Sequence, residues 1–241
     1  MRIAELRTVD DFQRAYRLFD DIWHPEPGNP PMPVELMVAF AHAGGYLAGA
    51  YSPDGELVGA SVGFLADGNA LHSHVTGARP GLGIGTLIKR HQRQWCLDRG
   101  ITAIRWTFDP LVRRNAYFNL VKLGARPEKY LEDFYGEMAD AVNAGDPSDR
   151  LLAVWRLDRE PERVPYDTAV EALDGEGRVH DTDGPLVLVA TPDDIEKVRT
   201  AEPERAREWR LAMREVLGGL MAAGAAVCGF TASGQYVVKR R

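Results

Sequence analysis

The sequence predicts an α/β (α+β) protein, and three local patterns carry the prediction. Apolar residues recur at helical spacing over 12–23, which indicates an amphipathic helix. Two strand-like segments flank the Pro-Asp-Gly turn at 52–55, as in a β-hairpin. A third strand-like segment, 70–78, leads through a glycine-rich turn into a further helix. Strands joined by both hairpins and helices indicate a mixed sheet rather than a helical bundle.

The amino-acid composition argues against several classes of function. The chain has 241 residues, of which 45% are hydrophobic and 27% charged, and its formal net charge is −6. This acidic balance argues against general binding to nucleic acid or to anionic membranes. No apolar run approaches the ~20 residues of a membrane span, and no signal peptide is visible. Cys96 and Cys228 lie far apart, so we expect free thiols in the reducing cytoplasm.

The elements before the glycine turn follow from caps and turns. Thr8 is a typical N-cap, with Asp11 three residues later as in a capping box. A second short helix is expected at 35–42, followed by the hairpin strands 46–51 and 56–65.

The elements after the turn are assigned in the same way. A helix ending at Gly100 precedes a strand over 101–108, and Asp109-Pro110 is typical of an N-cap followed by the first helical position. That helix is expected to end at Gly124 and to lead into strands at 130–138 and 151–157.

The last third of the chain begins with a segment of different amino-acid composition. Charged residues, Pro and Gly dominate 159–184, which indicates an irregular linker. The remaining expected elements are a strand at 186–190, a short helix capped by 191–194, a longer helix from Pro203, and a hairpin of 226–230 with 235–239.

Gly81, Gly83 and Gly85 lie between the third strand and its helix. Backbone N–H groups at such a helix start form an anion site suited to a pyrophosphate. Thr86 stands where a dinucleotide fold needs its third glycine, and no Gly-Lys-Ser/Thr of a phosphate loop follows. A tight turn that only allows close helix packing is the alternative.

The order of elements resembles the GNAT acyltransferase superfamily. The residues that carry the resemblance are 78–86, Asn115-Ala116 and 122–125, and it covers Met1 to about Asp158. It implies a mixed, mostly antiparallel central sheet flanked by helices, as a catalytic domain over 1–158. Residues 159–241 would then add a C-terminal β-α-α-β-β subdomain that packs on this domain, either extending its sheet or covering the acceptor cleft.

The same resemblance implies an acyl-CoA-dependent N-acyltransferase that uses acetyl-CoA or succinyl-CoA. Transfer would be direct, in a ternary complex, to a primary amine of a small molecule. A narrower similarity to a longer-chain bacterial subgroup favours an amino acid as acceptor. The alternative is a catalytically weak binding protein with the same fold that senses acyl-CoA or a metabolite. Either protein could form a homodimer.

The acyl-CoA contacts follow residue by residue from the resemblance. They are Thr76, Ala78, Arg79, Gly81, Leu82, Gly83, Ile84, Gly85, Thr86, Asn115 and Phe118. Two positions depart from the family pattern. Pro80 stands where Gln or Arg is usual, with Arg79 one place early, and Leu120 replaces a Tyr that commonly protonates the thiolate.

Two histidines are the candidates for the base. Strand alternation predicts that His72 and His74 share a face with Thr76 and Ala78. An imidazole of ordinary pKa accepts a proton at neutral pH. A metal pair is the alternative for His-x-His, but no third ligand accompanies it at a suitable spacing, so no metal is expected. Tyr117 is the phenol nearest to Leu120 and the candidate acid.

Other residues have weaker signals. Arg113, Arg114 and Tyr135 are candidates for binding the acceptor, since guanidinium groups pair with carboxylates. Lys89 and Arg90 either contact CoA phosphates or form a solvated helix face. Cys96 is expected within a helix with no base beside it, and is not predicted to be a nucleophile.

Overall fold

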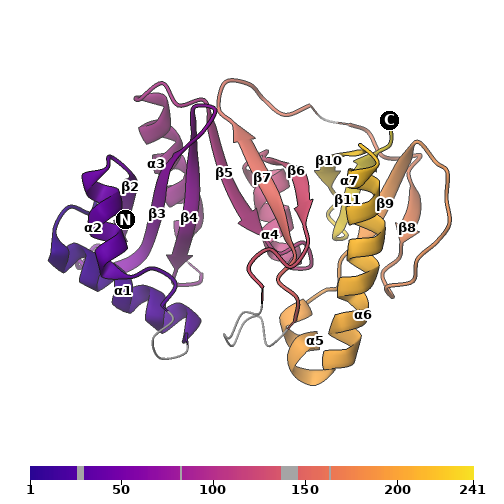
Figure 1. The fold of residues 1–241 in the computed structure, drawn as a ribbon, viewed down its shortest axis with the longest axis horizontal. Coiled ribbons are helices and arrows are strands. Elements are labelled where there is room, and N and C mark those ends of the chain that lie inside the picture. The colour runs from indigo at the N-terminus through magenta and orange to yellow at the C-terminus, as the bar shows by residue number, and fades with distance from the viewer. Residues whose placement is uncertain (26–29, 82, 137–145, 163) are drawn as a thin grey trace. The chain divides into compact units, whose positions relative to one another are not determined.

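The computed structural model describes residues 1–25, 30–81, 83–136, 146–162 and 164–241. Contacts divide the chain into two compact units, Met1–Trp106 and Thr107–Arg241, and each unit is described by itself (Figure 1). In the described residues, none of the helices has the length and apolar character needed to cross a membrane.

The first unit is built on a sheet in the strand order β1-β2-β3-β4-β5. Its strands are β1 (Arg2–Glu5), β2 (Tyr46–Tyr51), β3 (Leu57–Ala66), β4 (Ala70–Ala78) and β5 (Ala103–Phe108), the last of which crosses into the second unit. Neighbours are antiparallel except for the parallel pair β4 and β5. The predicted mixed, mostly antiparallel sheet is confirmed.

Helices cover both faces of this sheet. They are α1 (Val9–Trp23), α2 (Val34–His42) and α3 (Ile84–Leu97). The Thr8 capping box that begins α1 is present as predicted. α1 and α2 contribute to one apolar cluster with β2 and β3, while Ile84 and Ile88 of α3 pack in another.

The second unit begins with α4 (Arg113–Tyr117), which continues as a π-helical segment, η1 (Phe118–Lys122). Next come the antiparallel strands β6 (Arg126–Leu131) and β7 (Arg150–Arg156). The first of these strands was expected at 130–138. It ends earlier because Asp133 and Gly136 both adopt positive φ in a turn. Met138 lies outside the described residues.

The extension forms a second sheet in the order β10-β11-β9-β8. Its strands are β8 (Val170–Leu173), β9 (Leu186–Ala190), β10 (Ala226–Phe230) and β11 (Gln235–Lys239). Between β9 and β10 run α5 (Ile195–Ala201), α6 (Pro203–Met213), the π-helical η2 (Arg214–Gly218) and α7 (Gly219–Ala222).

These elements confirm the expected β-α-α-β-β order and add to it. β8 lies within the segment that was expected to be irregular. In the described residues the strands of the extension pair with one another, so the expectation that they extend the main sheet is wrong.

Candidate active site

The glycine turn has a backbone geometry that suits the predicted anion site. Gly81 and Gly83 have φ of 89° and 64°, in the left-handed region that favours glycine. Gly83 is the N-cap of α3 and provides no side chain to occupy the first N–H groups of the helix. No acidic residue lies in the first turn of α3. The helix dipole and these N–H groups therefore favour an anion at this end.

The residues around the turn have distinct environments. A Cβ added at Gly81 or Gly83 would meet nothing within 4 Å, so the backbone here is open to a ligand. Ile84 is buried, whereas Gly85 and Thr86 are half-buried. Arg79 forms an ion pair of 2.7 Å with Glu56. Leu82 lies outside the described residues.

β4 and β5 pair over only part of their length. Their parallel register runs from Ala70↔Ala103 to His72↔Arg105, while β4 continues to Ala78. Within the described register, the second half of β4 has its antiparallel partner β3 on one side and no paired β5 residue on the other. Backbone groups on that edge are available to a ligand.

A bulge in β4 corrects the expected arrangement of side chains. Ser73 pairs with Gly63 and Val75 with Val62, which leaves His74 as the extra residue. Thr76 consequently lies on the α3 face, where its hydroxyl is 2.8 Å from that of Ser61. Ala78 lies on that face too, close to the position of a Cβ added at Gly59, which would also touch Ile84.

The two histidines lie on the other face. The His72 ring stacks on Phe64 at 4.9 Å between centroids, and the His74 ring is 5.8 Å from Phe64. Phe64 in turn contacts Phe40 of α2. His72 and His74 do not share a face with Thr76 and Ala78, because the bulge interrupts the strand alternation on which that prediction depended.

The imidazole centroids are 6.0 Å apart, with His72 half-buried and His74 exposed. Desolvation, followed by the charges of His74 and Lys89, lowers the pKa of His72 to about 4. Desolvation also lowers the pKa of His74. The lowered pKa leaves the rings largely unprotonated at neutral pH and also makes each a weaker base than an ordinary imidazole. In the described part of the chain, no group of three or more His, Cys, Asp or Glu residues is arranged to hold a metal ion.

Behind β4 lies a buried polar network that the sequence did not reveal. Lys89 Nζ donates to Ser73 Oγ at 2.9 Å and to Gln92 Oε1 at 3.0 Å. Gln92 Nε2 donates to Ser73 Oγ at 3.2 Å and approaches Ser61 Oγ at 3.5 Å. Lys89 is thus buried rather than at the surface, where a phosphate contact or a solvated helix face would place it. The available signal was Gln92, four residues beyond Ile88 on the apolar stripe of α3.

Cys96 also lies on the inner side of α3, and burial raises the pKa of its thiol to about 12. This agrees with the expectation that Cys96 is not a nucleophile. Both cysteines are free thiols.

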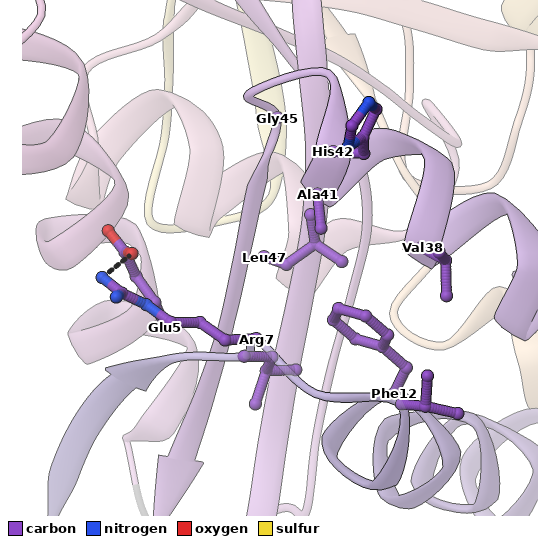
Figure 2. Close-up of a pocket in the computed structure, with 10 residues that line it drawn as sticks. Glu5, Arg7, Phe12, Val38, Ala41, His42, Gly45 and Leu47 are labelled. Atoms are coloured by element: carbon purple, nitrogen blue, oxygen red, sulfur yellow. Dashed lines mark hydrogen bonds and ion pairs between the residues drawn. The ribbon is translucent and has the colours of Figure 1, made fainter.

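The first unit contains a separate cavity of about 460 Å³. Phe12, Val38, His42 and Leu47 are among its lining residues (Figure 2). Leu47 lies near the start of β2, whereas the glycine turn follows the end of β4, which pairs through β3 with the end of β2. The cavity is therefore at the opposite end of the sheet from the predicted pyrophosphate site.

Other predicted site residues belong to the second unit. Tyr117 is 36% exposed at the end of α4, with Lys122 Nζ 5.7 Å from its ring. Asn115 is exposed and Phe118 is half-buried. The Tyr135 hydroxyl is 2.9 Å from Thr107 Oγ1, and the Arg150 guanidinium is 5.4 Å from the Tyr135 ring.

The two arginines predicted to bind an acceptor are engaged by the extension. Arg113 donates to Thr191 and pairs with Asp193. Arg114 donates through both terminal nitrogens to Glu196, at 2.5 and 2.6 Å. A carboxylate of an acceptor would compete with these pairs.

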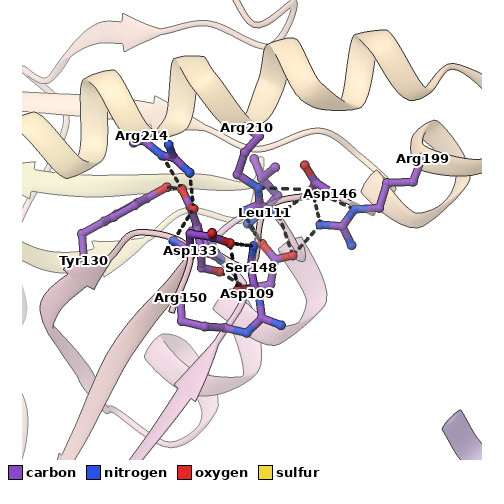
Figure 3. Close-up of polar contacts among 12 residues, drawn as sticks. Asp109, Leu111, Tyr130, Asp133, Asp146, Ser148, Arg150, Arg199, Arg210 and Arg214 are labelled. Atoms are coloured by element: carbon purple, nitrogen blue, oxygen red, sulfur yellow. Dashed lines mark hydrogen bonds and ion pairs between the residues drawn. The ribbon is translucent and has the colours of Figure 1, made fainter. Parts of the chain in front are cut away.

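Asp109 is not the N-cap that the sequence predicted. α4 begins at Arg113 with Val112 as its N-cap, and Asp109 Oδ1 instead accepts from Leu111 N at 2.9 Å. Arg210 donates to both oxygens of Asp109 at 2.9 Å, and Arg199 to Oδ2 at 2.5 Å (Figure 3).

Asp146 completes this buried cluster, which we call the ion cluster: Asp109, Asp146, Arg199 and Arg210. Both arginines also donate to Asp146 Oδ2, at 2.8 and 2.9 Å. Burial by itself would raise the pKa of Asp109, but the Arg210 and Arg199 guanidinium groups outweigh it and hold that pKa well below its usual range. The cluster fixes α5 and α6 to the segment that follows β5.

Comparison with known proteins identifies the fold. No protein-family model matches the sequence, and no curated protein matches it at a significant level. Among solved structures, the ribosomal-protein-S18-alanine N-acetyltransferase from Escherichia coli aligns at 13% identity and TM-score 0.50, over 68% of this chain and 98% of that chain. An aminoglycoside 6'-N-acetyltransferase complexed with coenzyme A aligns at 18% identity and TM-score 0.50, over 67% and 100%.

A third structure, Naa20 from Chaetomium thermophilum in complex with a bisubstrate analogue, aligns at 14% identity and TM-score 0.51. It covers 66% of this chain and 88% of its own. About a third of this chain therefore lies outside each alignment. The chain has the fold of the GNAT N-acetyltransferases, as its sequence predicted.

Proposed function

We propose that the chain is an acyl-CoA-dependent N-acyltransferase that transfers the acyl group directly to a primary amine of a small molecule. One observation carries the proposal. The glycine turn opens α3 immediately after β4, where the described pairing of β4 with β5 has already ended, in a chain with the N-acetyltransferase fold. The proposed anion site would thus lie beside strand backbone that has no paired β5 residue in the described register.

The residues of the glycine turn fit a pyrophosphate. Space for a ligand exists at Gly81 and Gly83, and the first turn of α3 has no carboxylate to repel an anion. The N–H groups of Gly83, Ile84 and Gly85 would hold the phosphate oxygens. When bound, the thioester supplies the activated acyl group. The backbone of β4 around Thr76 to Ala78 would donate hydrogen bonds to its carbonyl oxygen.

His72 or His74 would take the proton from the amine. A neutral imidazole accepts a proton directly or through one water. The low pKa of His72 keeps it in that form throughout the neutral range. Tyr117, as the exposed phenol on α4, is the proposed acid for the departing thiolate.

The narrower parts of the proposal concern the substrates. Acetyl-CoA and succinyl-CoA are the proposed donors, and an amino acid is the proposed acceptor. Arg113, Arg114 and Tyr135 would bind the acceptor, in competition with Asp193 and Glu196 for the two guanidinium groups. We propose a catalytic domain over 1–158, with 159–241 covering the acceptor, in the reducing cytoplasm.

The test is thiol release from acetyl-CoA and from succinyl-CoA over a panel of amines, with CoA binding measured by calorimetry. We expect release with at least one amine, and replacing both His72 and His74 with Ala should lower kcat by about 10²-fold or more. His42→Ala, an exposed histidine on α2, is the matched control and should leave release unchanged.

Two outcomes would contradict this proposal. Tight CoA binding without release for any amine would favour the binding protein that senses acyl-CoA. Release that survives the loss of both histidines would remove them from the chemistry. Gly83→Ala provides an independent check, because a left-handed φ strains any other residue and should weaken CoA binding.

A further inference from the structure

Lys89 is a buried cation with no acidic partner among the described residues. The residue is 5% exposed, and its Nζ contacts only Ser73 Oγ, Gln92 Oε1 and the Trp106 ring, whose centroid is 4.1 Å away. Two neutral oxygens and an aromatic face stabilise an ammonium group less well than a carboxylate would. A residue this costly to bury calls for a role beyond packing.

The contacts of Lys89 place its charge behind Ser73, the residue between the two histidines. Ser73 lies between His72 and His74, and its side chain points to α3 while theirs point away. The bulge follows Ser73 immediately, because Gly63↔Ser73 is succeeded by Val62↔Val75. Trp106 is next to Arg105, the register partner of His72 on β5. The ammonium group is therefore held at the position where β4 bulges and its pairing with β5 ends.

We propose that Lys89 is a positioning residue of the predicted acyl transfer. Its ammonium group holds Ser73 against α3, which fixes the strand immediately before the bulge and directs the preceding side chain, His72, to the opposite face. Its charge opposes protonation of the His72 imidazole, in addition to the burial of that ring. This inference rests on the proposed function, since it concerns the candidate base of that reaction.

The sign of the effect follows from the groups that face His72. His74 comes from β4 itself, and Lys89 from α3. Arg105 comes from β5, with its guanidinium paired to Asp67 at 3.1 Å, and Phe64 of β3 contributes an uncharged ring. The cation of Lys89 opposes a second positive charge on His72, so removing it should raise the His72 pKa. Burial lowers the pKa of Lys89 itself to about 7, and the charge is complete only below that pH.

The experiment is an NMR titration of the His72 imidazole in the full chain, with the resonance assigned by its loss in His72→Gln. Lys89→Met keeps the length of the side chain and removes the charge, whereas Lys89→Arg keeps the charge. Arg90→Met removes a charge from the exposed neighbour on the same helix and is the matched control. Native amide spectra define the pH range that is used for each variant.

In the wild type we expect His72 to titrate near 4, far below an ordinary imidazole. Lys89→Met should raise that midpoint by about 0.5 unit or more, and Lys89→Arg and Arg90→Met should leave it close to the wild type. The acid limb of the pH profile of thiol release should move in the same direction in Lys89→Met.

Two results would overturn the inference: an ordinary His72 pKa in the wild type, or the same pKa in folded Lys89→Met. If Lys89→Met fails to fold, an ordinary His72 pKa in the wild type still refutes the charge effect, and Lys89→Gln takes its place in the titration. Ser73→Ala, which leaves the charge in place, then tests the bulge: an unchanged His72 environment would refute the positioning. Absence of thiol release with every amine would refute the proposed function and would leave the titration result intact.

Discussion

Lys89 in the first unit and Arg210 in the second are both buried cations, 5% and 0% exposed, but their surroundings differ. Arg210 belongs to the ion cluster, where two guanidinium groups meet two carboxylates. Lys89 meets only neutral oxygens and an aromatic ring among the described residues. The protein thus buries charge in two ways, one balanced and one unbalanced.

This difference in surroundings gives the two kinds of buried charge different roles. In the ion cluster, both guanidinium groups contact both carboxylates, so the charges offset one another and fix the extension to the segment after β5. At Lys89, the uncompensated charge has a pKa of about 7, within the range of pH that proteins experience. Balanced charges hold a geometry, whereas an unbalanced one adjusts the protonation of its neighbours.

The largest expected effect comes from breaking the balance of the ion cluster. Asp109→Asn keeps the size of the side chain but leaves Arg199 and Arg210 with one carboxylate fewer. Removing one partner of a buried pair leaves an uncompensated charge, which should lower the free energy of unfolding by about 3 to 5 kcal/mol. Equilibrium denaturation followed by tryptophan fluorescence measures this, because Trp209 lies on the same helix as Arg210.

Asp193→Asn is the control for this variant. Its side chain is 93% exposed where it pairs with Arg113, so the loss should stay below about 1 kcal/mol. The acid dependence is a second check. The folded-state pKa of Asp109 is depressed, so its stabilisation is present above the unfolded value and is lost as pH falls below about 4. A loss below about 1 kcal/mol in Asp109→Asn would contradict the structural role of the cluster.

A pH dependence of the same sign, but in an alkaline window, is expected from Lys89. Its folded pKa of about 7 lies below the unfolded value of about 10.4, so the unfolded chain binds more protons between these two pH values. The free energy of unfolding should therefore rise with pH across this window by up to roughly 4 kcal/mol, since each pKa unit is worth about 1.4 kcal/mol. Denaturation at several pH values measures the rise, and Lys89→Met should lack it. An equal rise in both proteins would show that Lys89 is not an uncompensated charge.

The sequence predicted the fold better than it predicted the positions of the charges. Local signals determine the Thr8 capping box, the hairpin at 52–55 and the glycine turn, and all three are observed as predicted. The ion cluster joins residues about 100 positions apart, such as Asp109 and Arg210, and no local sequence pattern predicts such a contact. From sequence, Asp109 is predicted to be a helix N-cap because Pro110 follows it.

The candidate site was predicted in type but not in geometry. Strand alternation placed His72 and Thr76 on one face, and a single extra residue at His74 moved them to opposite faces. A bulge depends on the pairing of two strands, and one strand alone does not reveal it. From sequence, Lys89 is expected either to contact CoA phosphates or to lie on a solvated helix face, and lysine is rarely buried. Only the packing of α3 against β4 shows that its ammonium group is buried against Ser73.

The smallest effect on stability is expected at the surface pair of Arg114 and Glu196. It tests whether burial or the number of hydrogen bonds determines how much an ion pair contributes to the free energy of unfolding. Arg114 donates two short hydrogen bonds to Glu196, as Arg210 does to Asp109, but its side chain is 65% exposed and that of Glu196 is 31% exposed. Water and salt screen such a pair, so Arg114→Gln should lower the free energy of unfolding by less than about 1 kcal/mol.

A double-mutant cycle with Glu196→Gln isolates the pairing energy, and repeating it in about 1 M salt should abolish most of that energy. A coupling as large as the effect of Asp109→Asn would mean that bidentate geometry alone stabilises the second unit. A small, salt-sensitive coupling would instead assign the difference between Arg114 and Arg210 to burial, because the two arginines form the same kind of bond and differ in their access to water.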